Sequence, residues 1–271
     1  MSQQMIETFR RDGIVFPLPV FSAEEIAHRY AALQALESAR AGRLPPLLNF
    51  KPHLLVPWLW ELIREPRILD PVAELLGEDL LCWEASFFSK GPSDKAFVTW
   101  HQDATYWGLT ENIGVTAWLA FTPSTRANGC MRVIPGSHAR ALAHVETQDR
   151  NNMLPAREAV GETIDESKAL DVELAPGEMS LHHPILIHGS APNTSAERRV
   201  GLAIRYIGAH VAQRGAARGT ATLVRGTDHG HFDLEQAPEA ELHADARARH
   251  AVLLRRWMKI VSAAAGAAHA D

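Results

Sequence analysis

Cysteine is scarce in this chain, and its scarcity excludes two classes of protein. Only Cys82 and Cys130 are present among 271 residues. A disulfide-stabilised scaffold needs a denser set of cysteines, and a structural zinc site usually shows closely paired ones. We therefore expect two free, buried thiols in a reducing compartment, which predicts a cytoplasmic protein.

Long apolar runs and an excess of positive charge are also missing. No run approaches the roughly 20 apolar residues that span a bilayer, and the opening MSQQMIETFRRDG has no apolar segment typical of a secretory signal. Lysine and arginine number 27 against 32 aspartates and glutamates, for a net charge of -5. Without an overall basic field, a nucleic-acid or membrane partner is not expected.

Apolar residues, at 46% of the chain, are sufficient for a sizeable core. Helical periodicity appears near both ends, and the second helix opens on a Ser22-x-x-Glu25 capping box. A further pattern breaks into two short helices around Pro66 and ends at Gly77. The predicted helical segments are 2–12, 23–40, 56–76 and 241–262.

Residues 80–208 have a different texture, with short apolar or alternating runs separated by Gly, Pro, Asn and Ser. Strands at this spacing favour a mainly β barrel or sandwich flanked by N- and C-terminal helices. We expect one domain, with 1–79 as helical support and a candidate lid, 80–210 as barrel core and 211–271 as C-terminal loop and helix. The predicted strands are 13–21, 80–89, 97–101, 114–121, 130–134, 171–174, 178–188 and 198–208.

The stretch FVTWHQDATYWGL contains two residue types that bind metals, His101 and Asp103. On a strand, residues i and i+2 point to the same face, so both side chains can reach one ion while Gln102 faces away. A second histidine would complete the 2-His-1-carboxylate set of non-haem iron(II) sites. His188, beside a Gly-Ser turn at the end of an apolar run, is the preferred candidate; His182 and His183 are the alternatives.

The segment RRVGLAIRY adds a candidate anion-binding arginine. By strand alternation, Val200, Leu202 and Ile204 share one face, whereas Arg199 shares the other with two small residues that leave room for a ligand. A guanidinium grips a carboxylate with two hydrogen bonds. Arg198, one step out of phase, and Arg205, in phase but further along, are the competing choices.

Several motifs together resemble the phytanoyl-CoA dioxygenase family of iron(II)- and 2-oxoglutarate-dependent oxygenases. They are WHQD, NGCMRVIPGSH and IHGSAPNTSAERR, and the likeness extends over roughly residues 5 to 235. The resemblance implies a double-stranded β-helix, or jelly-roll barrel, with iron(II) as the metal and 2-oxoglutarate and O₂ as cosubstrates. It implies His101, Asp103 and His188 as iron ligands.

The same resemblance implies roles for further residues. Arg199 would bind the distal carboxylate of 2-oxoglutarate with help from Ser190, and Trp118 would line the cosubstrate pocket. Lys90 stands near a lysine position of the family. Tyr106 and Trp107, which follow the ligand strand, are candidates for contact with the substrate.

The implied activity is hydroxylation of an unactivated C–H bond of a small metabolite, with release of succinate and CO₂. Relatives that halogenate replace the carboxylate ligand with a small residue, so Asp103 favours hydroxylation. A metal-dependent barrel enzyme of another class, such as an isomerase, would need the three ligands but not Arg199. A non-catalytic binding protein would need neither the three ligands nor Arg199. The oligomeric state has no signal in the sequence.

Two further groups of residues are open to a functional or a structural interpretation. Asn49, Lys51, His53, Trp58 and Trp60 are candidates for a lid, and packing or solvation explains them equally well. The histidines of HGHF, at 229 and 231, have strand spacing but no evident third ligand. We expect HGHF to be a loop rather than a second metal site.

Overall fold

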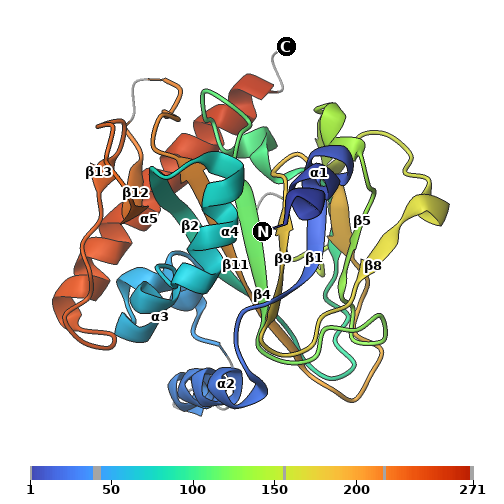
Figure 1. The fold of residues 1–271 in the computed structure, drawn as a ribbon, viewed down its shortest axis with the longest axis horizontal. Helices are drawn as coiled ribbons and strands as arrows, with labels where there is room; N and C mark the ends of the chain where they lie inside the picture. The colour runs from blue at the N-terminus through green and yellow to red at the C-terminus, as the bar shows by residue number, and fades with distance from the viewer. Residues whose placement is uncertain (1, 39–43, 155–156, 216–217, 269–271) are drawn as a thin grey trace.

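Two β-sheets form the centre of the molecule (Figure 1). The computed structural model describes residues 2–38, 44–154, 157–215 and 218–268, except for the side chains of Tyr106 and 261–268. The larger sheet has the order β1-β9-β4-β11-β2-β12-β13, and the smaller has β3-β10-β5-β8. Strand bounds are β1 Ile14–Pro19, β2 Leu80–Lys90, β3 Val98–His101, β4 Val115–Ala120, β5 Met131–Val133, β8 Leu170–Val172, β9 Glu178–His182, β10 His188–Ser190, β11 Arg199–Gly208, β12 Thr220–Arg225 and β13 Asp233–Leu234.

The helices lie where periodicity predicts them. The Ser22 and Glu25 capping box forms as expected, because each side chain accepts a hydrogen bond from the other residue's backbone amide. Pro66 occupies the first turn of α4, where a missing amide hydrogen costs nothing, and Gly77 ends that helix. The bounds are α1 Gln3–Asp12, α2 Ala23–Ser38, α3 Pro57–Leu62, α4 Pro66–Leu76 and α5 Ala244–Ala268, with 3₁₀ turns η1 Pro46–Asn49, η2 Pro52–Leu54, η3 Asp103–Tyr106, η4 Ser137–Ala139 and η5 Glu166–Lys168.

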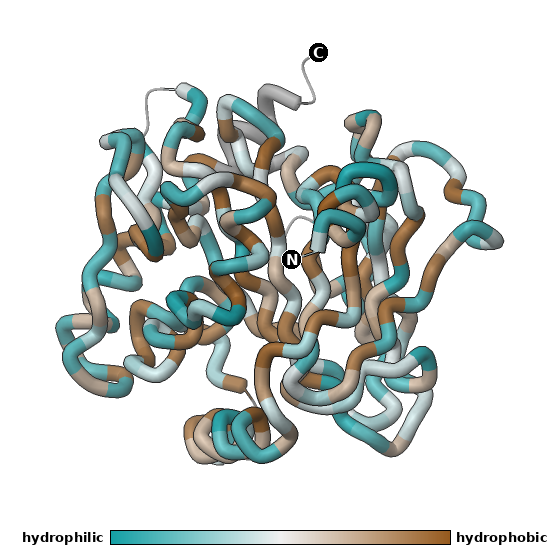
Figure 2. Tube along the Cα trace, viewed as in Figure 1, coloured by the Kyte–Doolittle hydropathy of each residue, from teal (hydrophilic) through white to brown (hydrophobic). Residues whose placement is uncertain are grey.

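The main core lies between helices α2 to α4 and one face of the larger sheet. Leu59, Ile68 and Val72 from the helices pack against Val200, Leu202 and Ile204 of β11, and none of them is measurably exposed. Each fully buried side chain of this kind stabilises the fold by about 1.5–3 kcal/mol. The three β11 residues therefore confirm the predicted alternation, and apolar residues concentrate along these strands (Figure 2).

The opposite face of the larger sheet looks toward the smaller sheet. Trp118 of β4 and Ala203 of β11 meet Met131 and Val133 of β5 in this space. The predicted jelly-roll double-stranded β-helix is thus confirmed, in the form of two facing sheets rather than a closed barrel. A small hairpin, β6 (His144–Glu146) with β7 (Glu158–Val160), stands beside the smaller sheet.

The prediction of one strand over 178–188 is wrong. β9 ends at His182 and β10 begins at His188, in different sheets. Pro184 lacks an amide hydrogen for a ladder, and Leu186 donates to the carbonyl of His183 to close a turn. The break places His188 in the smaller sheet, whereas His182 lies in the larger sheet.

Cys82 and Cys130 are free and buried, as expected. Among the described residues, no helix is long and apolar enough to cross a membrane.

Within the candidate lid, Lys51 and His53 are buried instead of surface-exposed, and Lys51 forms an ion pair with Glu235. His229 binds the Asp79 carboxylate at 2.9 Å, and no metal-binding group that includes His231 occurs in the described part of the chain.

Candidate metal centre and cosubstrate pocket

His101, Asp103 and His188 converge between the two sheets. Each offers one ligand atom, and these atoms all lie within 4.8 Å of one another. His101 and His188 face each other across the β3–β10 ladder, which places their ring centroids 4.1 Å apart. The strand ends at His101, so Asp103 reaches the site from the first position of η3, with its Oδ1 3.4 Å from His101 Nε2.

Hydrogen bonds at the back of each imidazole orient it toward this centre. His101 Nδ1 lies 2.9 Å from the Thr99 carbonyl oxygen, and His188 Nδ1 lies 2.9 Å from that of Leu186. A proton on each Nδ1, donated to these carbonyls, leaves Nε2 with a lone pair for a metal. Gln102 faces away, as predicted, and donates to the carbonyls of Arg140 and Ile185.

Charges around the group favour an ionised carboxylate. Burial opposes ionisation of Asp103, but Arg205 and His101 outweigh it and hold the Asp103 pKa well below its usual value. Burial lowers the pKa of His188 well below its usual value, so that this imidazole is neutral. Burial also opposes protonation of His101, yet Asp103 raises its pKa. An ionised carboxylate and two imidazoles form the donor set of a non-haem iron(II) site, so the three residues fit that metal.

Arg205 lies immediately behind Asp103, a role that the sequence interpretation did not assign to it. Its Nε lies 3.4 Å from Asp103 Oδ2, while Nη1 donates to Ser86 Oγ at 2.9 Å and forms an ion pair with Glu84. The signal in the sequence was that Arg205 lies on the same face of β11 as Arg199. Sequence reasoning missed its partner Glu84 because that residue lies 121 positions away on β2.

Arg199 is at the other end of the same pocket. Its side chain is 2% exposed, donates to the Gly129 carbonyl at 2.7 Å, and has a buried Nε without a hydrogen-bond partner among the described residues. Burial lowers the Arg199 pKa to about 10, which still leaves it charged at neutral pH. An unpartnered buried donor on a guanidinium is costly unless an anion completes it.

Lys90, Ser190 and Trp118 complete this end. Lys90 Nζ donates to Ser190 Oγ at 2.7 Å, and Arg199 Cζ lies 5.4 Å from the centre of the Trp118 ring. Burial, followed by repulsion from Arg199, lowers the Lys90 pKa to about 7. Arg199 and Ser190 line this end of the pocket, Lys90 adjoins it through Ser190, and the one carboxylate in the described lining, Asp103, is at the other end.

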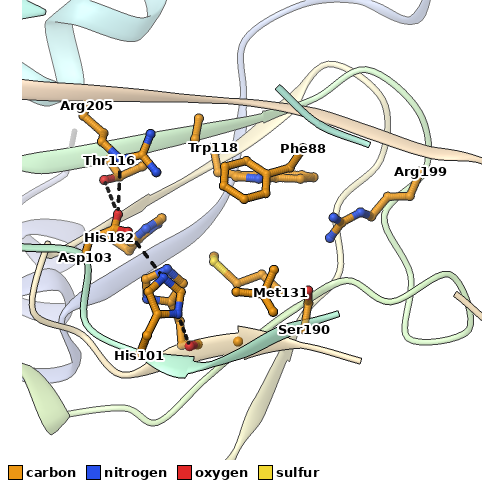
Figure 3. A pocket seen from close by; sticks show the side chains of 14 residues that line it. Phe88, His101, Asp103, Thr116, Trp118, Met131, His182, Ser190, Arg199 and Arg205 are labelled. Atoms are coloured by element: carbon orange, nitrogen blue, oxygen red, sulfur yellow. Dashed lines mark hydrogen bonds and ion pairs between the residues drawn. The ribbon is translucent and has the colours of Figure 1, made fainter. Parts of the chain in front are cut away.

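The pocket connects these two ends. Figure 3 shows Asp103 with His101 and Arg205 at one side and Arg199 with Ser190 at the other, separated by Trp118, Phe88 and Met131. His182 also lines the pocket from β9, but it is not part of the group whose ligand atoms converge.

The remaining predicted site residues lie elsewhere. His183 packs against His138 with the two rings tilted, their centroids 5.2 Å apart. Arg198 points away from the pocket and grips Glu37 with two hydrogen bonds of 2.6 and 2.7 Å. Trp107 is buried against Trp83 and lines a second, adjoining cavity. The side chain of Tyr106 lies outside the described part of the structure.

The fold and the site define a class of protein. Two facing jelly-roll sheets that hold a His–Asp–His group are the framework of non-haem iron oxygenases that use 2-oxoglutarate. The sequence model of the phytanoyl-CoA dioxygenase family matches residues 9–201. The chain belongs to the phytanoyl-CoA dioxygenase family.

Curated relatives of this chain include proteins named as dioxygenases. A probable alpha-ketoglutarate-dependent hypophosphite dioxygenase of Stutzerimonas stutzeri is 31% identical over 70% of this chain and 72% of that protein. A probable phytanoyl-CoA dioxygenase of Caenorhabditis elegans is 29% identical over 55% of this chain, and an ectoine dioxygenase of Bordetella parapertussis is 26% identical over 56%. The chain spans about half the length of these last two, 51% and 54%.

Solved structures agree over more of the chain. The non-heme monooxygenase ThoJ, in its apo form, is 34% identical with a TM-score of 0.85, and the match covers 97% of this chain and 99% of that one. CytC3 with Fe(II) and alpha-ketoglutarate is 26% identical with a TM-score of 0.68, over 90% and 96%.

Proposed function

We propose that this protein is an iron(II)- and 2-oxoglutarate-dependent dioxygenase that hydroxylates an unactivated C–H bond of a small metabolite. The observation that carries the proposal is the relationship between the two ends of one buried pocket. The convergent side chains of His101, Asp103 and His188 occupy one end, and the buried Arg199, whose Nε has no hydrogen-bond partner among the described residues, occupies the other. A dicarboxylate that chelates a metal through one end and binds arginine through the other satisfies both.

In this proposal His101, Asp103 and His188 hold iron(II), which supplies the activation of O₂ that oxidises the substrate while 2-oxoglutarate becomes succinate and CO₂. Arg199 binds the distal carboxylate of 2-oxoglutarate, and its planar donors fix the orientation of that group. Ser190, held by Lys90, offers its hydroxyl at the same end. Trp118, Phe88 and Met131 line the space between and keep water out of the pocket.

Asp103 distinguishes hydroxylation from halogenation, because a carboxylate ligand leaves no slot for a halide. Arg205 supports this role: it donates toward Asp103 Oδ2 and keeps the carboxylate ionised. The substrate as a small molecule and the cytoplasmic location remain predictions from the sequence. Neither alternative, an isomerase-like metal enzyme or a binding protein, explains why an arginine is buried at position 199.

Anaerobic titration of the protein with iron(II) and then 2-oxoglutarate tests the proposal. We expect the visible metal-to-ligand charge-transfer band of an iron-bound 2-oxoacid. Arg199→Ala should still bind iron but lose affinity for 2-oxoglutarate by at least about 100-fold, the effect of losing a buried charge-assisted pair. Arg198→Ala, one residue away and turned toward Glu37, is the matched control and should keep its affinity. Absence of the band in the wild-type protein would refute the proposal.

A further inference from the structure

A second cavity of about 860 Å³ adjoins the metal pocket and shares Phe88, Asp103 and Arg205 with it. Because Asp103 belongs to both, a molecule in this outer cavity lies next to the metal ligands. The volume is at the upper end of ordinary ligand sites, so it accommodates a body larger than an amino acid.

The C-terminal helix α5 closes one wall of the outer cavity. Leu254 and Trp257 of α5 line it, although both lie beyond the 9–201 segment that matches the family. The helix is anchored on Phe50, whose carbonyl oxygen lies 2.6 Å from His250 Nε2 and whose ring centroid lies 4.9 Å from that of Trp257. This wall therefore lies outside the matched family segment.

Aromatic rings dominate the apolar lining. They come from β2, α5, the residue after η1 and the segment after η3, and so surround the space from several sides. Such rings bind flat apolar groups and also attract cations to their faces. The rings are Phe50, Trp83, Phe87, Phe88, Trp107 and Trp257.

The charged lining is acidic. Four carboxylates, those of Glu84, Asp94, Asp103 and Glu158, face two guanidiniums, Arg198 and Arg205. Both guanidiniums are already engaged with carboxylates: Arg198 binds Glu37 through two hydrogen bonds, and Arg205 binds Glu84 and Asp103. An anionic substrate would have to displace one of these carboxylates from its guanidinium, whereas an ammonium group lies beside the other two lining carboxylates, Asp94 and Glu158.

We propose that the outer cavity binds a substrate with an aromatic or alicyclic body and a positively charged amine, and that it disfavours carboxylates and acyl-CoA thioesters. This inference rests on the proposed function, because it identifies the substrate class of the same metal site. The amine lies among the acidic side chains and the aromatic rings, and the apolar body extends along the wall formed by Trp257. Substrate selection thus depends on a helix outside the matched family segment.

The test uses sets of compounds that share one ring system and carry a side chain of positive, neutral or negative charge. Tryptamine, N-acetyltryptamine and indole-3-propionate form one set; the corresponding phenyl and cyclohexyl compounds form two more, and octanoyl-CoA is added. Each is titrated anaerobically into the wild-type protein loaded with iron(II) and 2-oxoglutarate, and perturbation of the charge-transfer band gives the affinity. We expect at least one amine to bind at least about tenfold more tightly than both partners of its set.

Three results would overturn the inference: equal binding within every set, failure of all the amines to bind, or preference for an acid or for octanoyl-CoA. In each case the charge-transfer band would still support the proposed function. If the band never forms, the proposed function fails and the inference with it. A Glu158→Gln variant should weaken binding of the preferred amine about tenfold. Glu146→Gln, at the opposing position of the β6–β7 hairpin, is the matched control. Unchanged amine affinity in Glu158→Gln would contradict the electrostatic basis.

Discussion

The indole of Trp118 packs directly against the bare backbone of Gly201 on the neighbouring strand. A Cβ at position 201 would collide with three atoms of the Trp118 ring. The missing side chain is what allows Trp118 to lie beside Arg199, whose Cζ is 5.4 Å from the ring centre. One glycine therefore shapes the end of the pocket to which we assign 2-oxoglutarate.

A Gly201→Ala substitution should push Trp118 into that pocket. We expect 2-oxoglutarate affinity to fall at least about tenfold and the free energy of unfolding to fall by about 1–3 kcal/mol, the usual cost of overpacking. Titration of the charge-transfer band and urea unfolding measure the two effects. Gly161→Ala serves as control, since the nearest atom to its Cβ would be at an ordinary 3.4 Å. Wild-type affinity in Gly201→Ala would show that Trp118 does not border the cosubstrate.

Replacement of His188 and His182 should have different effects on metal binding. His182 is buried, both its ring nitrogens lack hydrogen-bond partners among the described residues, and burial lowers its pKa to about 4. It is nevertheless outside the convergent group. His188→Ala or Asp103→Ala should lower iron(II) affinity at least about 100-fold, and His182→Asn by about tenfold or less. Competition against a chelator gives these affinities; equal losses in His182→Asn and His188→Ala would contradict the ligand assignment.

Affinity for 2-oxoglutarate should decrease as the pH rises above about 7. The Lys90 pKa is about 7 because burial and Arg199 disfavour its charged form. Below that pH the ammonium attracts the dicarboxylate, and above it a proton must be taken up on binding. We expect about a tenfold loss between pH 7 and 8.5. In Lys90→Met the affinity should be lower and independent of pH over this range, and a slope as steep as that of the wild type would assign the effect to another group.

Glu235 should contribute strongly to stability, because it neutralises the buried Lys51. It also accepts hydrogen bonds of 2.7 Å from Thr220 and Thr222. Burial raises its pKa, but Lys51 and His53 outweigh this and lower it to about 2. Glu235→Gln leaves a buried unpaired ammonium and should cost about 3–5 kcal/mol of unfolding free energy at pH 7.

The pH dependence of stability gives a second measurement for the same pair. A carboxylate whose pKa falls from 4.5 to about 2 on folding stabilises the protein above pH 4.5, and this stabilisation is lost as the pH falls from 4.5 toward 2. Urea unfolding at several pH values should show a shallower loss in Glu235→Gln than in the wild type. The double variant Lys51→Met with Glu235→Leu should regain most of the stability, since no unpaired charge remains; failure to regain it would point to the threonine bonds instead.

Much of the metal centre was predictable because its determinants are local. The two-residue period of a strand separates Arg199 from Val200, and the extended backbone at Gln102, one residue past the end of β3, turns its side chain away from the site. These relationships depend on backbone geometry alone. The family resemblance then selected His188 from three histidines, although the expected strand over 178–188 is in fact two strands in different sheets.

The sequence by itself determined the residue types of the site, their alternation on β11 and the family of the fold. Only the tertiary structure decided which distant groups became partners. It placed Arg205 between Asp103 and Glu84, and it closed the outer cavity with Trp257 from a helix far along the chain. No local period encodes such contacts, because they depend on how the sheets and helices pack. That packing also decides the charge and shape that a substrate meets.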